Sequence, residues 1–407
     1  MKIARRRVSL QSGPGSGKGG APAASESGAP QTSVARLPAI YCDPASKYAR
    51  AALEGGGYRF VADPRDADLL WMREGFEKWF ERLQPFQLLN HLPNWQAVTD
   101  KGLLAEHLRR FDRVQSKYDF GMKDLVQETC CLYIDEERAR FFGQLPSADS
   151  RENLWILKPC SSSRGVGIRI MWQFDELRDL YAHPGKHDFD PEDERFVIQR
   201  YIRNPLLLDA RKSEMRLYWL IPSLDPLLVL MYREGTVRLN SKPFVLDDFD
   251  NTLVHVTNVF QQKSHPEYDP SVVLKWSFSD LESYLVRDLK LAPENYIEGH
   301  LKPQLKRMLS FVSEAAASSL VQCPAKGLFF GLFGADVILD DTLHPWLTEV
   351  QKGPGLSFDD PVKQKVIPPM LNEAVSIVLE VRRRKRDGLS LRNLEAVRGF
   401  EWVIPAM

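Results

Sequence analysis

Short runs of apolar, aromatic and β-branched residues, separated by stretches with helical spacing, limit most strongly the folds open to this chain. The runs are rich in Trp, Tyr, Ile and Val, which favour strands. Alternation of such runs with helical patterns predicts layered sheets and helices, that is, an α/β or α+β class. The predicted strands cover residues 154–158, 168–172, 196–202, 214–221, 227–232, 332–339 and 345–350.

The composition is that of a globular chain without strong net charge. Its 407 residues contain 54 Lys and Arg against 54 Asp and Glu, so the formal net charge is zero. A chain of this length divides into roughly two or three domains and can bury a large core. Zero net charge removes the long-range attraction that a nucleic-acid-coating protein uses, so we expect no nucleic-acid partner.

The longest apolar stretches and the cysteines indicate the compartment. Residues 217–232 and 327–339 are interrupted by Asp225 and Asp336 and fall short of the roughly 18 residues of a spanning helix, so we expect no membrane association. Cys130 and Cys131 are adjacent, the cysteine count is odd and no CxxC pair occurs, which fits neither a disulfide framework nor a zinc site. We therefore expect a reducing, cytoplasmic location.

Residues 1–36 are rich in Gly, Ala, Ser and Pro, and their charged residues are basic except for Glu26. This composition predicts a disordered basic tail, and an organellar transit peptide is the alternative. Residues 13–19 resemble a phosphate-binding loop, but Ser12 stands in place of the first glycine and Gly19 in place of the Ser or Thr that holds magnesium. We therefore assign no function to this stretch.

A strand, a lysine and a small-residue loop follow one another in residues 155–168. Small residues let main-chain N–H groups approach an anion, and Lys158 and Arg164 add positive charge at the two ends of the loop, beside Gly165. The pattern is typical of a polyphosphate site. A flexible hairpin between two strands is the alternative, because glycines serve it equally well.

Charged residues alternate at the start of the strand predicted after residue 211. Lys212, Glu214 and Arg216 share one face, and Met215 and Leu217 turn to the other. This row could bind a nucleotide or an anionic substrate. Alternatively, it is the solvated face of a half-buried strand.

Acidic residues interrupt two otherwise apolar strands. Asp336 lies within residues 333–339, and Glu349 and Gln351 lie two residues apart within residues 345–351. Buried acids are costly unless they hold a cation or a partner, and oxygen ligands of this kind suit Mg²⁺. A salt bridge to a nearby Lys or Arg is the alternative.

A helical pattern near the C-terminus ends in a basic run. Apolar residues from Leu371 to Leu379 recur on one face of a helix predicted to begin after Pro368 and Pro369. The helix leads into residues 382–386, which are all Arg or Lys. Cations there favour a helix C-terminus, and the run is also one candidate surface for an acidic partner.

Taken together, these segments resemble the tubulin tyrosine ligase-like family, whose members have an ATP-grasp architecture. The resemblance implies an N-terminal α/β domain over residues 37–100, a central ATP-grasp lobe over 101–200, a C-terminal lobe with the metal site over 201–383 and a C-terminal extension over 384–407. The matching pieces, in order, are residues 89–93 with Lys101, 158–167, 199–207, 232–238, 255–258, 332–336 and 349–357.

The resemblance also implies an activity: ATP-dependent joining of a free amino acid to a carboxylate of a protein, usually on the acidic C-terminal tail of tubulin, through an acyl phosphate. Arg216 and Glu349 would be catalytic, and Arg238, Lys263 and Lys363 would hold substrate carboxylates. Mg²⁺ would bind Asp336, Glu349 and Gln351. ATP would be bound by Lys101, Lys158, Arg164, Gly165, Lys212 and Glu214, by the adenine hinge Gln199, Arg200, Tyr201 and Ile202, and by Thr257 and Asn258.

The chain departs from the family pattern at two positions, and these bear on the activity. Glu214 stands where the family usually has Asp, and Gln351 where it usually has Asn, so each side chain is one methylene longer. Lys263 follows Asn258 at the spacing of glutamate-adding members, which makes glutamate the first choice. Tyrosine or glycine ligation, a non-tubulin acceptor and a catalytically impaired microtubule-binding scaffold stay open. The resemblance further implies a monomer at cytoplasmic microtubules, including those of cilia and flagella.

Overall fold

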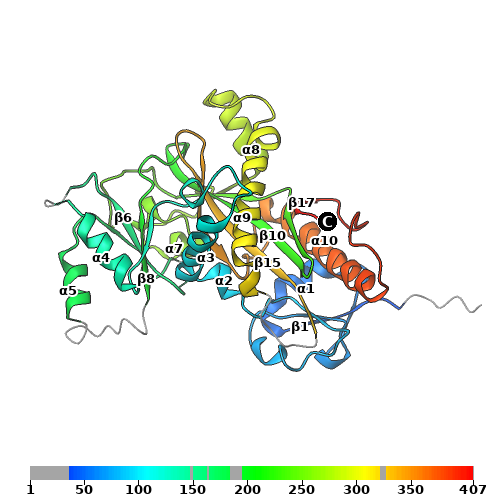
Figure 1. Ribbon diagram of the computed structural model, residues 1–407. Coiled ribbons are helices and arrows are strands. Elements are labelled where there is room, and N and C mark those ends of the chain that lie inside the picture. The colour runs from blue at the N-terminus through cyan, green and yellow to red at the C-terminus, as the bar shows by residue number, and fades with distance from the viewer. Residues whose placement is uncertain (1–35, 147–149, 163–164, 184–194, 321–326, 407) are drawn as a thin grey trace, which may run out of the picture. The chain divides into compact units, whose positions relative to one another are not determined.

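The computed structural model describes residues 36–146, 150–162, 165–183, 195–320 and 327–406 (Figure 1). The predicted basic tail lies outside these ranges except for its last residue, Arg36. Residues 37–407 form one compact unit with three sheets. Parallel and antiparallel sheets packed with helices confirm the predicted mixed α/β class.

The first sheet is parallel, and its strands come from two distant parts of the chain. Its order is β14-β4-β3-β1-β2. The last part of the chain to join it is β14, which lies immediately before the long strand β15. The elements are β1 (Ala39–Cys42), β2 (Arg59–Phe60), β3 (Leu69–Trp71), β4 (Leu88–Leu89), β14 (Leu328–Phe329), α1 (Lys47–Leu53) and the short helices Pro44–Ser46, Pro64–Asp66 and Glu77–Trp79.

The second sheet is antiparallel, with the order β5-β8-β6-β7. Its apolar face packs on two helices through Phe141, Trp155 and Phe174, and the rings of Phe141 and Trp155 meet edge to face at 4.9 Å. The elements are β5 (Thr129–Cys131), β6 (Trp155–Pro159), β7 (Arg169–Met171), β8 (Phe196–Arg200), α4 (Asp135–Gln144) and α5 (Asp175–Ala182).

The third sheet is built around β10, which pairs with β11, β12 and β15 along its length. Its strands are β9 (Leu207–Leu208), β10 (Arg211–Leu224), β11 (Leu227–Tyr232), β12 (Thr236–Leu239), β13 (Lys275–Trp276), β15 (Gly331–Leu339), β16 (Pro345–Gln351) and β17 (Phe400–Ile404). The other helices are α2 (Gln96–Thr99), α3 (Lys101–Val114), α6 (Thr252–His255), α7 (Val259–Ser264), α8 (Phe278–Ser283), α9 (Lys302–Leu320), α10 (Pro361–Arg386), the short Met122–Asp124 and the π-helical turns Tyr284–Asp288 and Ile297–Leu301.

Both faces of the third sheet are buried along most of β10. Leu217 and Trp219 lie in one apolar core with α9, and Tyr218 and Leu220 lie in another with α10. Figure 1 shows β10 beside β15, with the two helices against them. Towards the start of β10 the second face is polar, so the candidate site lies on a continuation of the face that α10 covers.

Each predicted strand run is confirmed within a few residues, as β6, β7, β8, β10, β11, β15 and β16. Helix α3 begins after Asp100, whose side chain caps it by accepting the N–H groups of Gly102 and Leu103. The lobe boundaries at residues 100, 200 and 383 stay a prediction. Within the described ranges, no helix has the length and apolar character that a bilayer crossing requires.

The predicted start of the C-terminal helix is wrong. Helix α10 begins at Pro361 and contains both Pro368 and Pro369. Its first turn has the stronger signal, because Asp360 accepts the N–H of Lys363 and Pro361 occupies the first turn, where the missing N–H costs nothing. An internal proline costs about 3 kcal/mol, and α10 offsets that cost by burying one face in an apolar core.

Candidate active site

Cross-strand register brings the charged residues of four strands onto one face of the third sheet. Arg238 lies opposite Glu214, Asp336 lies opposite Arg216, and Glu349 lies opposite Asp336. Directly opposed residues point to the same face. The predicted alternation on β10 is confirmed, because Met215 and Leu217 belong to the apolar core on the other face.

Asp336 lies between two guanidinium groups at the centre of this face. Its side chain is completely buried. Arg216 Nη2 donates to Asp336 Oδ2 at 2.8 Å, Arg216 Nε pairs with the other oxygen, and Arg238 Nη2 lies 2.7 Å from Oδ2. Burial alone would raise the pKa of Asp336, but Arg216 and Arg238 lower it below its ordinary value. The carboxylate is therefore ionised at neutral pH.

Glu214 is held by groups from three other segments. Its Oε2 lies 2.6 Å from Arg238 Nη2 and accepts the Thr257 hydroxyl, and its Oε1 accepts the Thr348 hydroxyl at 2.6 Å. The register of β15 with β16 shifts between Asp336 and Val337, at Thr348. This irregularity turns Thr348 towards Glu214, and nothing in the sequence marks it.

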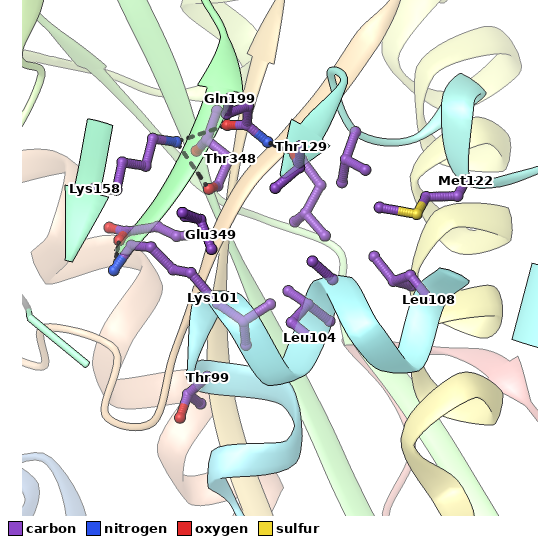
Figure 2. A pocket seen from close by; sticks show the side chains of 15 residues that line it. Thr99, Lys101, Leu104, Leu108, Met122, Thr129, Lys158, Gln199, Thr348 and Glu349 are labelled. Carbon is purple, nitrogen blue, oxygen red and sulfur yellow. Dashed lines mark hydrogen bonds and ion pairs between the residues drawn. The ribbon is translucent and has the colours of Figure 1, made fainter. Parts of the chain in front are cut away.

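Glu349, on β16, contacts Lys101 at the start of α3. Lys101 Nζ lies 3.6 Å from Glu349 Oε2 (Figure 2). The Gln351 amide donates to the other carboxylate oxygen of Glu349. Burial raises the pKa of Glu349, and the neighbouring Asp336 raises it further. An acid in this setting is more stable as an anion when a cation joins it.

Lys158 and Lys212 are buried ammonium groups with neutral partners. Lys158 Nζ donates to Gln199 Oε1 at 2.8 Å and to the Thr348 carbonyl at 3.4 Å (Figure 2), and Lys212 Nζ donates to the Tyr201 hydroxyl at 3.0 Å. Burial lowers the pKa of each lysine to about 8. In the described part of the chain, no carboxylate lies within ion-pair distance of either nitrogen. Two such charges suit an anionic ligand.

The start of α3 is hydrogen-bonded to the small-residue loop. Lys101 Nζ donates to the Ser162 carbonyl at 2.9 Å, and Asp100 accepts the Ser161 hydroxyl at 2.9 Å and Arg195 Nη2 at 2.8 Å. Asp100 was not among the site residues expected from the sequence, so its contact with the loop was missed. Gly165 has φ of +73° and packs beside Gln261 and Val256 of the α6–α7 segment. Arg164 lies outside the described residues.

The predicted adenine hinge is the end of β8. Gln199 bridges Lys158 and Thr129, donating to the Thr129 hydroxyl at 2.8 Å. Arg200 turns outward, where it stacks 4.1 Å from the Trp155 ring and lies 3.3 Å from Glu128. Tyr201 is buried against Lys212 and His255, and Ile202 follows directly.

Thr257 and Asn258 flank the site in different ways. Thr257 donates to Glu214, whereas the Asn258 side chain caps α7 by accepting the N–H of Phe260 at 3.0 Å. Lys263 is an exposed residue of α7. Lys363, in the first turn of α10, is 7% exposed and donates to the Ser357 hydroxyl at 3.0 Å, and burial lowers its pKa to about 8.

A cavity of about 30 Å³ extends from these polar groups towards α3 (Figure 2). Space of this volume holds about one water molecule. Its polar end is formed by Lys101, Lys158, Gln199, Thr348 and Glu349, and its apolar end includes Leu104, Leu108, Met122, Val126, Leu347 and Val350.

The metal ligands predicted from sequence are close together but do not form a cage. Asp336 and Glu349 are cross-strand neighbours, and Gln351 touches Glu349. Within the described ranges, no group of three or more His, Cys, Asp or Glu side chains could hold a metal ion. Two acids fit a hard cation that completes its shell with water and substrate phosphate.

The basic run at the end of α10 is largely used internally. Arg384 pairs with Glu380 at 2.6 Å, Arg382 donates to the Phe86 carbonyl at 2.9 Å, and Lys385 donates to the Asp225 carbonyl at 2.5 Å. The run is therefore a poor candidate for an acidic partner, except at Arg383 and Arg386, whose side chains are 51% and 73% exposed.

Comparison with known proteins gives one consistent result. The tubulin-tyrosine ligase family matches residues 81–387. The chain is 30% identical over 328 residues to a probable tubulin polyglutamylase, TTLL2, of Mus musculus, which covers 78% of this chain and 55% of the mouse protein. It is 29% identical over 365 residues to a probable tubulin polyglutamylase, TTLL9, of Bos taurus, covering 79% and 75%. It is 29% identical over 345 residues to the tubulin polyglutamylase TTLL5 of Mus musculus, covering 82% and 24%.

Proposed function

Because the chain belongs to the tubulin-tyrosine ligase family, an ATP-grasp-like family, we propose that it is an ATP- and Mg²⁺-dependent ligase that adds glutamate to the C-terminal tail of tubulin. The chain spans about half the length of the TTLL2 relatives, 55% of the mouse and 50% of the human protein. The observation that carries the proposal is the pair of buried lysines, Lys158 and Lys212, with neutral partners beside the acids Asp336 and Glu349.

This chemistry needs an activated carboxylate. A carboxylate on the tail is a poor electrophile, and transfer of the γ-phosphoryl group of ATP converts it to an acyl phosphate. The amine of the incoming amino acid then attacks the acyl carbon and phosphate leaves. In this site Lys158 and Lys212 bind phosphate oxygens, and Arg216 faces the transferring group.

The residues present fit Mg²⁺ and a triphosphate. Glu349 is a buried acid with a raised pKa, and Asp336 lies opposite it, so a divalent cation would relieve their repulsion. Bound there with Gln351, Mg²⁺ supplies charge neutralisation on the phosphate oxygens. Lys101 contacts both Glu349 and the Ser162 carbonyl of the small-residue loop. This supports a role for the loop in which its main-chain N–H groups would bind the phosphates.

The hinge and the neighbouring loop complete the nucleotide site. Gln199, Arg200, Tyr201 and Ile202 would present main-chain groups to the adenine, and Gly165 of the loop, Thr257 and Asn258 would line its other sides. Arg164, which lies outside the described residues, stays a prediction from the sequence. Glu214 contributes indirectly, because Arg238, Thr257 and Thr348 already use both of its oxygens. The extra methylene of Glu214, relative to the family's Asp, lets one carboxylate reach all three partners.

Glutamate is favoured by the relatives, which are named as polyglutamylases. Arg238, Lys263 and Lys363 are the cations available for carboxylates of the amino acid or the tail. We further propose that the protein acts as a monomer at microtubules in the cytoplasm. The residue ranges 37–100, 101–200 and 201–383 are the lobes between which substrates bind.

The test is incubation of the purified chain with tubulin, ATP, Mg²⁺ and one of glutamate, glycine or tyrosine, followed by mass spectrometry of the tails. Addition of glutamate is expected, with loss of addition in Lys158→Met. Lys306→Ala is the matched control, because Lys306 pairs with Glu401 away from the site. Addition of glycine or tyrosine instead would show that the amino-acid substrate is not glutamate. Tubulin binding without any addition would support the scaffold alternative.

A further inference from the structure

Lys275 is a cation of the polar face that the sequence did not single out. On the edge strand β13 it lies directly opposite Arg238 of β12, which in turn lies opposite Glu214 of β10. Residues opposed in this way share a face. Lys275 therefore extends the row of charged side chains to the edge of the sheet.

Asp360 connects Lys275 to the start of α10. One oxygen of Asp360 accepts the main-chain N–H of Lys363 at 2.9 Å, and the other forms an ion pair with Lys275 Nζ. The side chains of Lys275 and Asp360 are 14% and 23% exposed. A half-buried ion pair of this kind fixes the first turn of α10, and with it Lys363, against the edge of the sheet.

Lys363 is a buried cation without an anionic partner. Its Nζ donates to the Ser357 hydroxyl, and within the described ranges no carboxylate lies within ion-pair distance of it. The charged groups that act on it are Lys275, Asp360, Asp359 and Arg216. An ammonium group that is 7% exposed gains most from a carboxylate supplied by a ligand.

Arg238 provides a further donor beside that of Lys363. Its Nη2 contacts Glu214 and Asp336, but its Nε is buried without a hydrogen-bond acceptor in the described part of the chain. A buried donor of this kind costs free energy until it meets an acceptor. Two sets of donors, on Lys363 and Arg238, are thus available for two carboxylates.

The position of these donors separates them from the nucleotide. Lys212 and Arg216 are four residues apart on β10, which corresponds to about 13 Å along the strand. In the proposed site Lys212 lies at the nucleotide end of β10. Lys363 lies beside Asp360, which pairs with Lys275 opposite Arg238. Burial, Lys275 and Arg216 all lower the pKa of Lys363. An anion at Lys363 is therefore carried by the amino acid or the acceptor, and a dicarboxylic amino acid matches two sets of donors where glycine and tyrosine, with one carboxylate, do not.

We propose that the Lys275–Asp360 ion pair is a positioning device that holds Lys363 where it and Arg238 bind the two carboxylates of an incoming dicarboxylic amino acid. This inference rests on the proposed function and assigns a role in specificity to Lys275 and Asp360, which are not among the site residues that the resemblance to the family implies.

The test is calorimetric binding of glutamate and of glutamine to the full chain with Mg²⁺ and a non-hydrolysable ATP analogue. Wild type is expected to bind glutamate more tightly than glutamine. Lys275→Met is expected to weaken glutamate binding about tenfold, the loss of roughly one charge-assisted hydrogen bond, and to leave glutamine binding unchanged. Lys275→Arg should restore most of the loss. Lys306→Ala should match wild type, because Lys306 lies on α9 and pairs with Glu401 of β17, at the opposite edge of the sheet.

Several outcomes separate this inference from the proposed function. Equal binding of glutamate and glutamine by wild type overturns the inference, even if tubulin is modified with another amino acid. Equal weakening of both ligands and of the ATP analogue in Lys275→Met also overturns it, because it shows a structural role only. Selective glutamate binding that is lost in Lys275→Met supports the inference even if no amino acid is transferred to tubulin, a result that would refute the proposed acceptor alone.

Discussion

Asp336 and Glu349 are opposed on neighbouring strands, yet isosteric amides at the two positions are expected to have opposite effects on stability. Asp336 is ionised between Arg216 and Arg238, so Asp336→Asn leaves Arg216 with a neutral partner and leaves Arg238 with Glu214 as its remaining carboxylate. Glu349 is a buried acid whose pKa is raised by burial and by Asp336. Glu349→Gln removes a charge that burial and the neighbouring Asp336 disfavour.

The magnitudes follow from these contacts. Removing one partner of a buried ion pair costs about 3–5 kcal/mol, so Asp336→Asn should lower the melting temperature by about 4–6 °C. Glu349→Gln should leave the free energy of unfolding unchanged or raise it. A raised pKa in the folded state means that stability is lost as the pH rises through that pKa, so the advantage of Glu349→Gln appears at neutral pH and vanishes as the pH falls below 4.5, the ordinary value.

The assay is urea unfolding of the nucleotide-free chain, followed by circular dichroism at about pH 5 and about pH 8. Asp341→Asn is the matched control, because Asp341 is exposed in the turn after β15. A loss below about 1 kcal/mol in Asp336→Asn would refute the assignment of Asp336 as the anion between two arginines. A loss in Glu349→Gln as large as that in Asp336→Asn would refute the account of Glu349.

Three further predictions concern groups around the same face. Lys158→Met should raise the free energy of unfolding by about 1–3 kcal/mol below pH 8, because burial lowers the folded-state pKa of Lys158 to about 8. The wild type should recover this stability as the pH rises above about 8. A variant less stable than wild type in urea unfolding would contradict this. Asp100→Ala should cost about 1–2 kcal/mol through the lost helix cap and should also weaken binding of a fluorescent ATP analogue, because the Ser161 contact is lost; unchanged nucleotide affinity would remove Asp100 from the site. Arg384→Ala should destabilise the chain by more than about 1 kcal/mol, and Arg383→Ala by less than about 0.5 kcal/mol, because Arg384 is held by Glu380 and Arg383 is largely exposed; equal thermal shifts of the two variants would contradict the internal use of the basic run.

Local sequence patterns were sufficient to predict the strands and to decide which residues of β10 share a face. A strand at the centre of an antiparallel sheet must alternate when part of one face is polar, so the row Lys212, Glu214 and Arg216 could be read from the sequence. Asp100 was likewise recognisable as a cap, because capping is decided within three residues.

Partners that come from distant segments could not be read in this way. Asp336 meets Arg216 across 120 positions of sequence, and only the register of β10 with β15 decides that meeting. The turn of Thr348 towards Glu214 depends on a local register shift. The ion pair of Arg384 depends on Glu380, which also accepts a main-chain N–H from the later loop at Glu395. The start of α10 was misplaced because two prolines were weighed without the packing that tolerates them.

The passage of residues 328–339 through two sheets has a mechanical consequence. Leu328 and Phe329 are hydrogen-bonded into the parallel sheet, and two residues later the same stretch enters the sheet that bears Asp336. With no connecting loop between them, those sheets behave as one rigid block. We therefore expect that a nucleotide binds and leaves through a movement of the β5–β8 sheet, which carries Lys158. The distance between spin labels on β1 and β15 should then stay constant whether or not a nucleotide is bound.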